Sequence, residues 1–73
     1  MKVETGRAPM PYEINCYDAN GNFDHRAYTD TLEKAERIRS SWAKRHGITE
    51  FDYMPTIWKY DYKEANYSRM EGY

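Results

Sequence analysis

Residues 30–47, DTLEKAERIRSSWAKRHG, are the one stretch of the chain with a clear helical period. Its apolar residues recur at spacings of three and four, so they share one helix face: Leu32, Ala35, Ile38, Trp42 and Ala43. Asp30 with Glu33 fits a capping box, and Thr31 is an alternative N-cap. Gly47 stands where a left-handed C-terminal cap belongs. This pattern predicts an amphipathic helix over 30–47.

The preceding segment predicts a β-hairpin. Residues 12–18 alternate between apolar and polar, Asn20-Gly21 suits a tight two-residue turn, and residues 22–29 return as a second strand. The resulting register pairs Cys16 with His25 and Ile14 with Ala27. It places four side chains on the buried face, namely Ile14, Cys16, Phe23 and Ala27, and four on the open face, namely Tyr17, Asp24, Arg26 and Tyr28. A three-residue turn with a bulge would instead shift the pairing by one and mix the faces.

Residues 48–62 predict a third strand whose two halves are out of phase around Pro55. A bulge at the proline would reset the phase and bring four aromatic residues to the helix-covered side: Phe51, Tyr53, Trp58 and Tyr60. The expected core is Ile14, Ala27, Leu32, Ile38, Trp42 and Trp58. The expected fold is α+β, a three-stranded antiparallel sheet in strand-strand-helix-strand order with one helix on one face. We expect a flexible arm over 1–11, a single domain over 12–62 and a loose tail over 63–73.

The composition of the chain narrows the range of functions it could have. The 73-residue chain has 11 basic and 12 acidic residues and a net charge of −1, so it lacks the bulk charge that attracts nucleic acid. A single cysteine excludes an intrachain disulfide and is typical of a cytoplasmic protein. No apolar run has the length of a membrane span, so we expect no membrane association.

The sequence carries no catalytic or phosphate-binding signature. Cys16 opposite His25 is the one suggestive pair, but a free cysteine is more often simply buried. A zinc site would need further ligands, and Cys16, His25 and His46 are widely separated along the chain without paired spacing. We therefore expect a protein that is not an enzyme and has no metal and no cofactor.

Aromatic and charged surface residues are the remaining candidates for function. Tyrosine and arginine are enriched at binding hot spots, and the chain has eight tyrosines. The predicted partner-binding site is the open hairpin face with one residue of the third strand: Tyr17, Asp24, Arg26, Tyr28 and Lys59. The alternative site is the basic outer stripe of the helix: Lys34, Arg37, Lys44 and Arg45. An equally open reading is that the tyrosines only cover the edges of a leucine-poor core.

The run Tyr28-Thr29-Asp30-Thr31-Leu32-Glu33-Lys34-Ala35, followed by Gly47, resembles a pattern of small phage-encoded inhibitor proteins with strand-strand-helix-strand order. The likeness is to anti-CRISPR proteins and to a phage inhibitor of bacterial RNA polymerase. It implies a non-enzymatic inhibitor in the host cytoplasm that sterically blocks a multi-subunit nucleic-acid-handling complex. Inhibition of host RNA polymerase and single-stranded nucleic-acid binding are the alternatives, although no direct nucleic-acid contact is expected. A homodimer that covers the open face is a further alternative.

Overall fold

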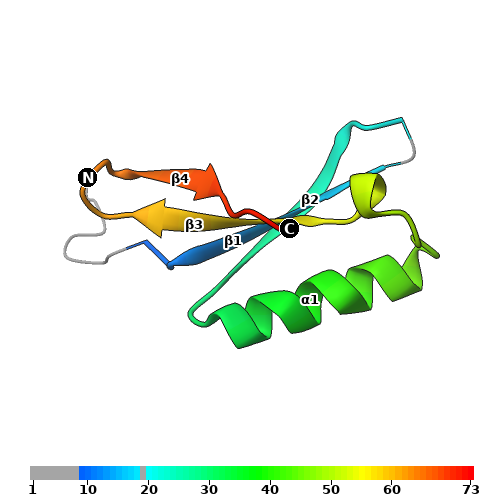
Figure 1. The fold of residues 1–73 in the computed structure, drawn as a ribbon, viewed down its shortest axis with the longest axis horizontal. Helices are drawn as coiled ribbons and strands as arrows, with labels where there is room; N and C mark the ends of the chain where they lie inside the picture. Colours follow the sequence, from blue (N-terminus) through cyan, green and yellow to red (C-terminus); the bar gives the residue numbers. More distant parts are fainter. Residues whose placement is uncertain (1–8, 19) are drawn as a thin grey trace, which may run out of the picture.

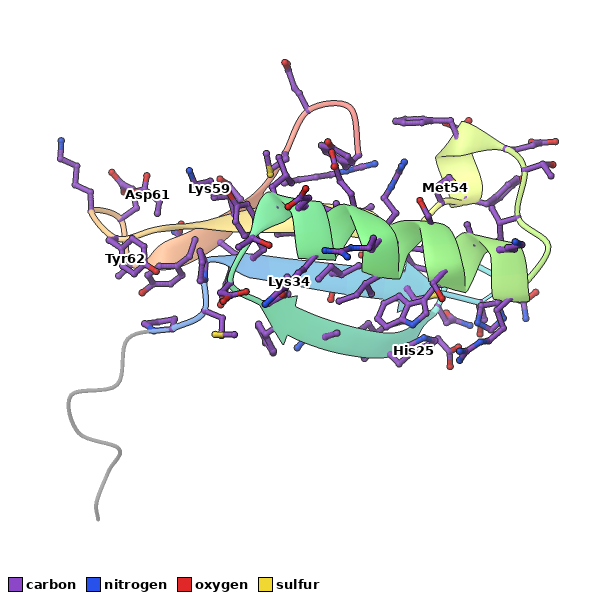
Figure 2. All side chains as sticks on the ribbon, turned by 90° about the horizontal axis from the view of Figure 1, so that it is seen from below. His25, Lys34, Met54, Lys59, Asp61 and Tyr62 are labelled. Atoms are coloured by element: carbon purple, nitrogen blue, oxygen red, sulfur yellow. The ribbon has the colours of Figure 1, made fainter. Side chains whose placement is uncertain are left out.

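The structure, a computed structural model, describes residues 9–18 and 20–73. It contains one antiparallel sheet with the strand order β2-β1-β3-β4 and one α-helix on one face of that sheet (Figures 1 and 2). The elements in chain order are β1 (Tyr12–Tyr17), β2 (Phe23–Thr29), α1 (Leu32–Arg45), the 3-10 turn η1 (Phe51–Tyr53), β3 (Thr56–Asp61) and β4 (Asn66–Arg69). The α+β class is therefore confirmed.

The sheet has four strands where the sequence predicts three. The additional strand, β4, lies within 63–73, which the sequence suggests is a loose tail. A turn held by the Asp61 carboxylate, which accepts from the backbone N–H groups of Lys63 and Glu64, folds the chain back so that Tyr67 pairs with Tyr60. Four residues are too few to show an alternating period, which is why the pattern does not reveal this strand.

Residues 9–11 lie beside the neighbouring strands β3 and β4. The backbone N–H of Tyr60 donates to the carbonyl of Pro11 at 2.8 Å, and the Tyr67 hydroxyl donates to the carbonyl of Met10 at 2.7 Å. The Tyr62 hydroxyl donates to Pro9 at 3.1 Å. These bonds fix the last part of the predicted 1–11 arm, and the rest of that arm, residues 1–8, lies outside the described residues.

Helix α1 begins after Thr31, whose hydroxyl accepts from the Lys34 N–H at 3.1 Å, so Thr31 rather than Asp30 is the N-cap. Asp30 instead pairs with Lys34 at 3.1 Å. At the other end Gly47 has a φ of 67°, and the Ile48 N–H donates to the Ala43 carbonyl at 2.8 Å. This is a Schellman motif, so the predicted left-handed cap at Gly47 is confirmed.

The core lies between α1 and the three strands β1, β2 and β3. Ile14, Ala35 and Ile57 are completely buried, and seven residues pack around them: Tyr12, Ala27, Leu32, Ile38, Trp42, Met70 and Tyr73. The prediction for Trp58 is wrong. Because residues 51–53 form η1, the strand alternation begins at Thr56, which turns Ile57 towards the helix and Trp58 away from it. Phe51 and Tyr53, also predicted to face the helix, are exposed. Tyr60, the fourth aromatic residue of that prediction, lies two residues after Trp58 in β3 and therefore also faces away from the helix.

The hairpin combines both registers that the sequence allows. Along most of its length Cys16 pairs with His25 and Ile14 with Ala27, as predicted, but the pairing shifts after Cys16 so that Tyr17 lies opposite Phe23. The cause is a turn wider than two residues, closed by the Asp18 N–H donating to the Asn22 carbonyl at 2.8 Å. The shift turns Phe23 out of the core; it is 51% exposed.

Candidate functional site

Aromatic side chains cover the face of the sheet opposite α1. They come from all four strands and form what we call the aromatic face: Tyr17, Phe23, Tyr28, Trp58, Tyr60 and Tyr67. Neighbouring rings are in contact, with the centroids of Tyr28 and Tyr67 5.9 Å apart and those of Tyr60 and Tyr67 4.9 Å apart. The Trp58 indole is held by its N–H, which donates to the Thr56 hydroxyl at 2.9 Å.

Beneath these rings lies a network of three polar side chains, the polar floor, made of Glu13, Asn15 and Arg26. Arg26 Nε donates to Asn15 Oδ1 at 2.8 Å, and Asn15 Nδ2 donates to Glu13 Oε1 at 3.1 Å. The other Glu13 oxygen lies 3.8 Å from Arg26 Nε. Glu13 and Asn15 are buried although the described residues place no further element over this face, because the surrounding rings exclude water from them. Buried polar groups of this kind are stable only when fully paired.

The environment of the polar floor affects the neighbouring phenols. Burial raises the pKa of Tyr28, and its contact with the Glu13 carboxylate adds to the effect. Burial also raises the pKa of Tyr67, with smaller contributions from Tyr28 and Glu13. Both phenols are therefore neutral hydrogen-bonding groups at physiological pH.

A shallow depression opens at the centre of the aromatic face. Its volume is about 410 Å³, and the polar floor lines it together with Tyr17, Phe23, Trp58 and Tyr67. Aromatic walls around a few fixed polar groups are typical of a site that receives an apolar side chain and orients it by hydrogen bonds.

The structure brings together three of the five predicted partner-binding residues: Tyr17, Arg26 and Tyr28. Asp24 does not join them, because the register shift places it beside His25 at the C-terminal end of α1. Lys59 does not join them either. It pairs with Tyr12 on the helix side of the sheet, where its Nζ lies 6.0 Å from the centre of the Tyr12 ring.

Sequence reasoning missed other members of this surface, namely Glu13, Asn15, Phe23, Trp58, Tyr60 and Tyr67. The alternation that placed Tyr17 on the open face also placed Glu13 and Asn15 there, so the sequence pattern was sufficient to assign these two residues to this surface. The four basic residues of the alternative site, Lys34, Arg37, Lys44 and Arg45, are all exposed on α1. They form a solvated stripe, and none of them lines the depression of the aromatic face.

A second group of side chains lies on the helix side. The ligand atoms of Cys16, His25 and His46, which we call the cysteine–histidine cluster, all lie within 4.8 Å of one another. These residues, which are widely separated along the chain and have no paired spacing, are therefore brought close together by the fold. Burial raises the pKa of the Cys16 thiol, and the Asp24 carboxylate raises it further. A protonated thiol is a poor nucleophile at neutral pH, which argues against a Cys16–His25 catalytic dyad.

Comparisons of the chain with protein-family models, with curated proteins and with solved structures find no match. Within residues 9–18 and 20–73, the single α-helix is too short and too polar to cross a membrane.

Proposed function

We propose that this chain is a small non-enzymatic protein-binding inhibitor that docks on its partner through the aromatic face. One observation carries the proposal: a hydrogen-bonded polar floor lies at the bottom of an aromatic depression on a sheet face that α1 does not cover. Rigid rings supply contact area at low entropic cost, and fixed polar groups supply specificity. A partner would insert an apolar side chain between the rings and contact the edge of the polar floor.

The charges of this surface favour a protein over a nucleic acid. Arg26 is the cation at its centre, and it is engaged by Asn15, by the Glu13 carboxylate and by the ring of Phe23. The buried Glu13 carboxylate would repel a phosphate backbone. Since neutralising phosphates supplies most non-specific affinity for nucleic acid, this surface lacks the main driving force.

The resemblance to small phage inhibitors suggests the class of partner. We propose a host complex that handles nucleic acid, blocked sterically as an anti-CRISPR protein would block it, with host RNA polymerase as the alternative target. A single-stranded nucleic-acid binder is a second candidate, because rings spread over a four-stranded sheet can also stack on bases.

The test compares double variants that change exposed residues only. Phe23→Ser with Tyr28→Ser removes two exposed rings from the aromatic face, which are 51% and 47% exposed. Phe51→Ser with Tyr53→Ser is the matched control, since it removes two exposed rings from η1. A third variant, Arg37→Glu with Lys44→Glu, reverses the helix stripe. Circular dichroism and urea unfolding first establish that each variant is folded.

The partner is identified by capture from bacterial lysate, and its affinity for each purified variant is then measured. We expect the aromatic-face variant to weaken binding by ~tenfold or more, as for hot-spot residues, and the η1 control to bind normally. Loss of binding only in the helix-stripe variant would move the site to α1. Tight binding of the purified protein to single-stranded oligonucleotides, lost in the aromatic-face variant, would favour the second candidate. Sedimentation velocity would reveal a homodimer through the same face.

A further inference from the structure

The cysteine–histidine cluster is assembled by three elements that meet at one end of the molecule. The β1–β2 register places His25 directly opposite Cys16 on the side of the sheet that faces α1. His46 is the C-cap of α1, so the end of the helix brings its ring over the same end of the sheet. Figure 2 shows His25 beneath the C-terminal half of α1. The rings of His25 and His46 are 5.9 Å apart between centroids.

We propose that Cys16, His25 and His46 form a transition-metal site of the zinc type with an open fourth position. Metal bonds of about 2.0–2.3 Å place neighbouring ligands of a tetrahedral site about 3.3–3.7 Å apart. The three ligand atoms, within 4.8 Å of one another, reach that spacing by small side-chain rotations. The exposed His46 has the freedom to make them. One thiolate and two imidazoles suit Zn²⁺, Co²⁺ or Cu²⁺ rather than the oxygen-seeking Mg²⁺ or Ca²⁺.

The groups around the cluster are also those of a metal site. His25 Nδ1 lies 3.1 Å from Asp24 Oδ2. A ring whose Nδ1–H donates to a carboxylate presents the lone pair of Nε2 to a metal, and a carboxylate is one of the usual partners of the second ring nitrogen in metal-binding histidines. The Trp42 ring packs edge-on against His25 with centroids 4.3 Å apart, which restricts the imidazole from the other side.

The cluster has a closed side and an open side. Cys16 is 1% exposed and forms the floor, whereas His46 is exposed. Asp24 and His46 also line a cleft of about 510 Å³ that continues along Gly47 and Glu50. The fourth coordination position therefore faces this cleft, where it would hold a water or a donor atom of a bound molecule. Metal binding would release the thiol proton of Cys16 to solvent and tie the end of α1 to the hairpin.

The experiment titrates the untagged full-length chain with Co²⁺ as a spectroscopic probe and then with Zn²⁺ as a competitor. We expect one Co²⁺ per chain, with a thiolate-to-cobalt charge-transfer band in the near ultraviolet and d–d bands of tetrahedral intensity. Stoichiometric Zn²⁺ should abolish both. Zn²⁺ should also raise the melting temperature, because it binds only the folded cluster.

Three variants and a control locate the site. Cys16→Ala should lose the charge-transfer band, and His46→Gln, an exposed change that leaves folding intact, should weaken affinity at least tenfold. Asp24→Asn should weaken it by about 10- to 100-fold, as is typical of a carboxylate behind a metal-binding histidine. Glu50→Gln, on the same cleft but outside the cluster, should bind like the unaltered chain. Absence of a thiolate band, or affinity unchanged in His46→Gln, would overturn the proposal.

Discussion

The guanidinium carbon of Arg26 lies 4.6 Å from the centre of the Phe23 ring, on the face of the sheet that α1 leaves uncovered. The contact exists because the hairpin register shifts between Cys16 and Tyr17. With the unshifted register Phe23 would point into the core. The shift therefore moves an aromatic ring from the core to the aromatic face, where it also covers the stem of Arg26.

This position predicts a small effect of Phe23 on stability. Phe23→Ala should lower the free energy of unfolding by less than about 1 kcal/mol, the value of a half-exposed cation–π contact. Trp42→Ala should lower it by about 2–4 kcal/mol, because that indole packs on the core and on His25. Urea denaturation followed by circular dichroism measures both. An equal loss in the two variants would show that Phe23 is a core residue after all.

The hydrogen bonds of the polar floor predict that truncating Asn15 lowers the free energy of unfolding by more than the small size of this side chain would suggest. Asn15→Ala removes the hydrogen-bond partner of both Arg26 Nε and Glu13 Oε1, and the Glu13 carboxylate remains buried beneath the rings. Leaving such groups unpaired costs about 1–3 kcal/mol. Asn66→Ala is the matched control at an exposed position of β4 and should cost far less. Equal unfolding midpoints for the two variants would mean that water already satisfies the polar floor.

The N-terminus of α1 predicts different effects for adjacent residues. Thr31→Ala should lower the free energy of unfolding by about 1 kcal/mol, since its hydroxyl accepts from the Lys34 N–H. Asp30→Ala should cost less, because its contact with Lys34 is a solvent-exposed ion pair. Thermal unfolding at low and high salt separates the two, as only the ion pair is screened. A larger loss in Asp30→Ala would restore the capping box predicted from sequence.

Local signals in the sequence were enough to predict α1 and most of the hairpin. The helical period and Gly47 lie within one segment, and the pairing of Cys16 with His25 follows from alternation and turn position. The errors arise where a local structure changes the count of residues in a strand. The wide turn after Asp18 displaces Phe23 and Asp24, and η1 removes residues 51–53 from the third strand. The wide turn moves only Phe23 and Asp24 from their predicted positions, because the pairing returns to the predicted register at His25, whereas η1 moves the strand residues that follow it to the opposite face.

Predicting the two candidate sites from the sequence required different amounts of long-range information. The aromatic face required the correct phase of all four strands, so Tyr17, Arg26 and Tyr28 were predictable while Trp58 and Tyr67 were not. The cysteine–histidine cluster required the hairpin register and the docking of the helix end together. No spacing along the chain encodes that convergence, since Cys16, His25 and His46 come from different elements.

The last prediction concerns alkaline pH. Burial raises the pKa values of Tyr28 and Tyr67 above the ordinary value of 10.0, so the fold favours their neutral forms. A raised pKa in the folded state means that the native chain holds more protons than the unfolded chain above pH 10. The stability that these phenols contribute is therefore fully present at pH values below their pKa in the unfolded chain. It is lost as the pH rises through their pKa values in the folded chain.

Urea denaturation between about pH 8 and about pH 11 should show this loss. The variant Tyr28→Phe with Tyr67→Phe should be less stable than the unaltered chain at pH 8, because Tyr67 loses its bond to the Met10 carbonyl, yet should lose less stability on going to alkaline pH. A residual loss is expected from Tyr73, whose hydroxyl donates to Glu36 and whose pKa that contact raises. Tyr53→Phe, at an exposed tyrosine of η1, is the control and should follow the unaltered chain. Parallel pH profiles for the double variant and the unaltered chain would show that the phenols of the aromatic face are fully solvated.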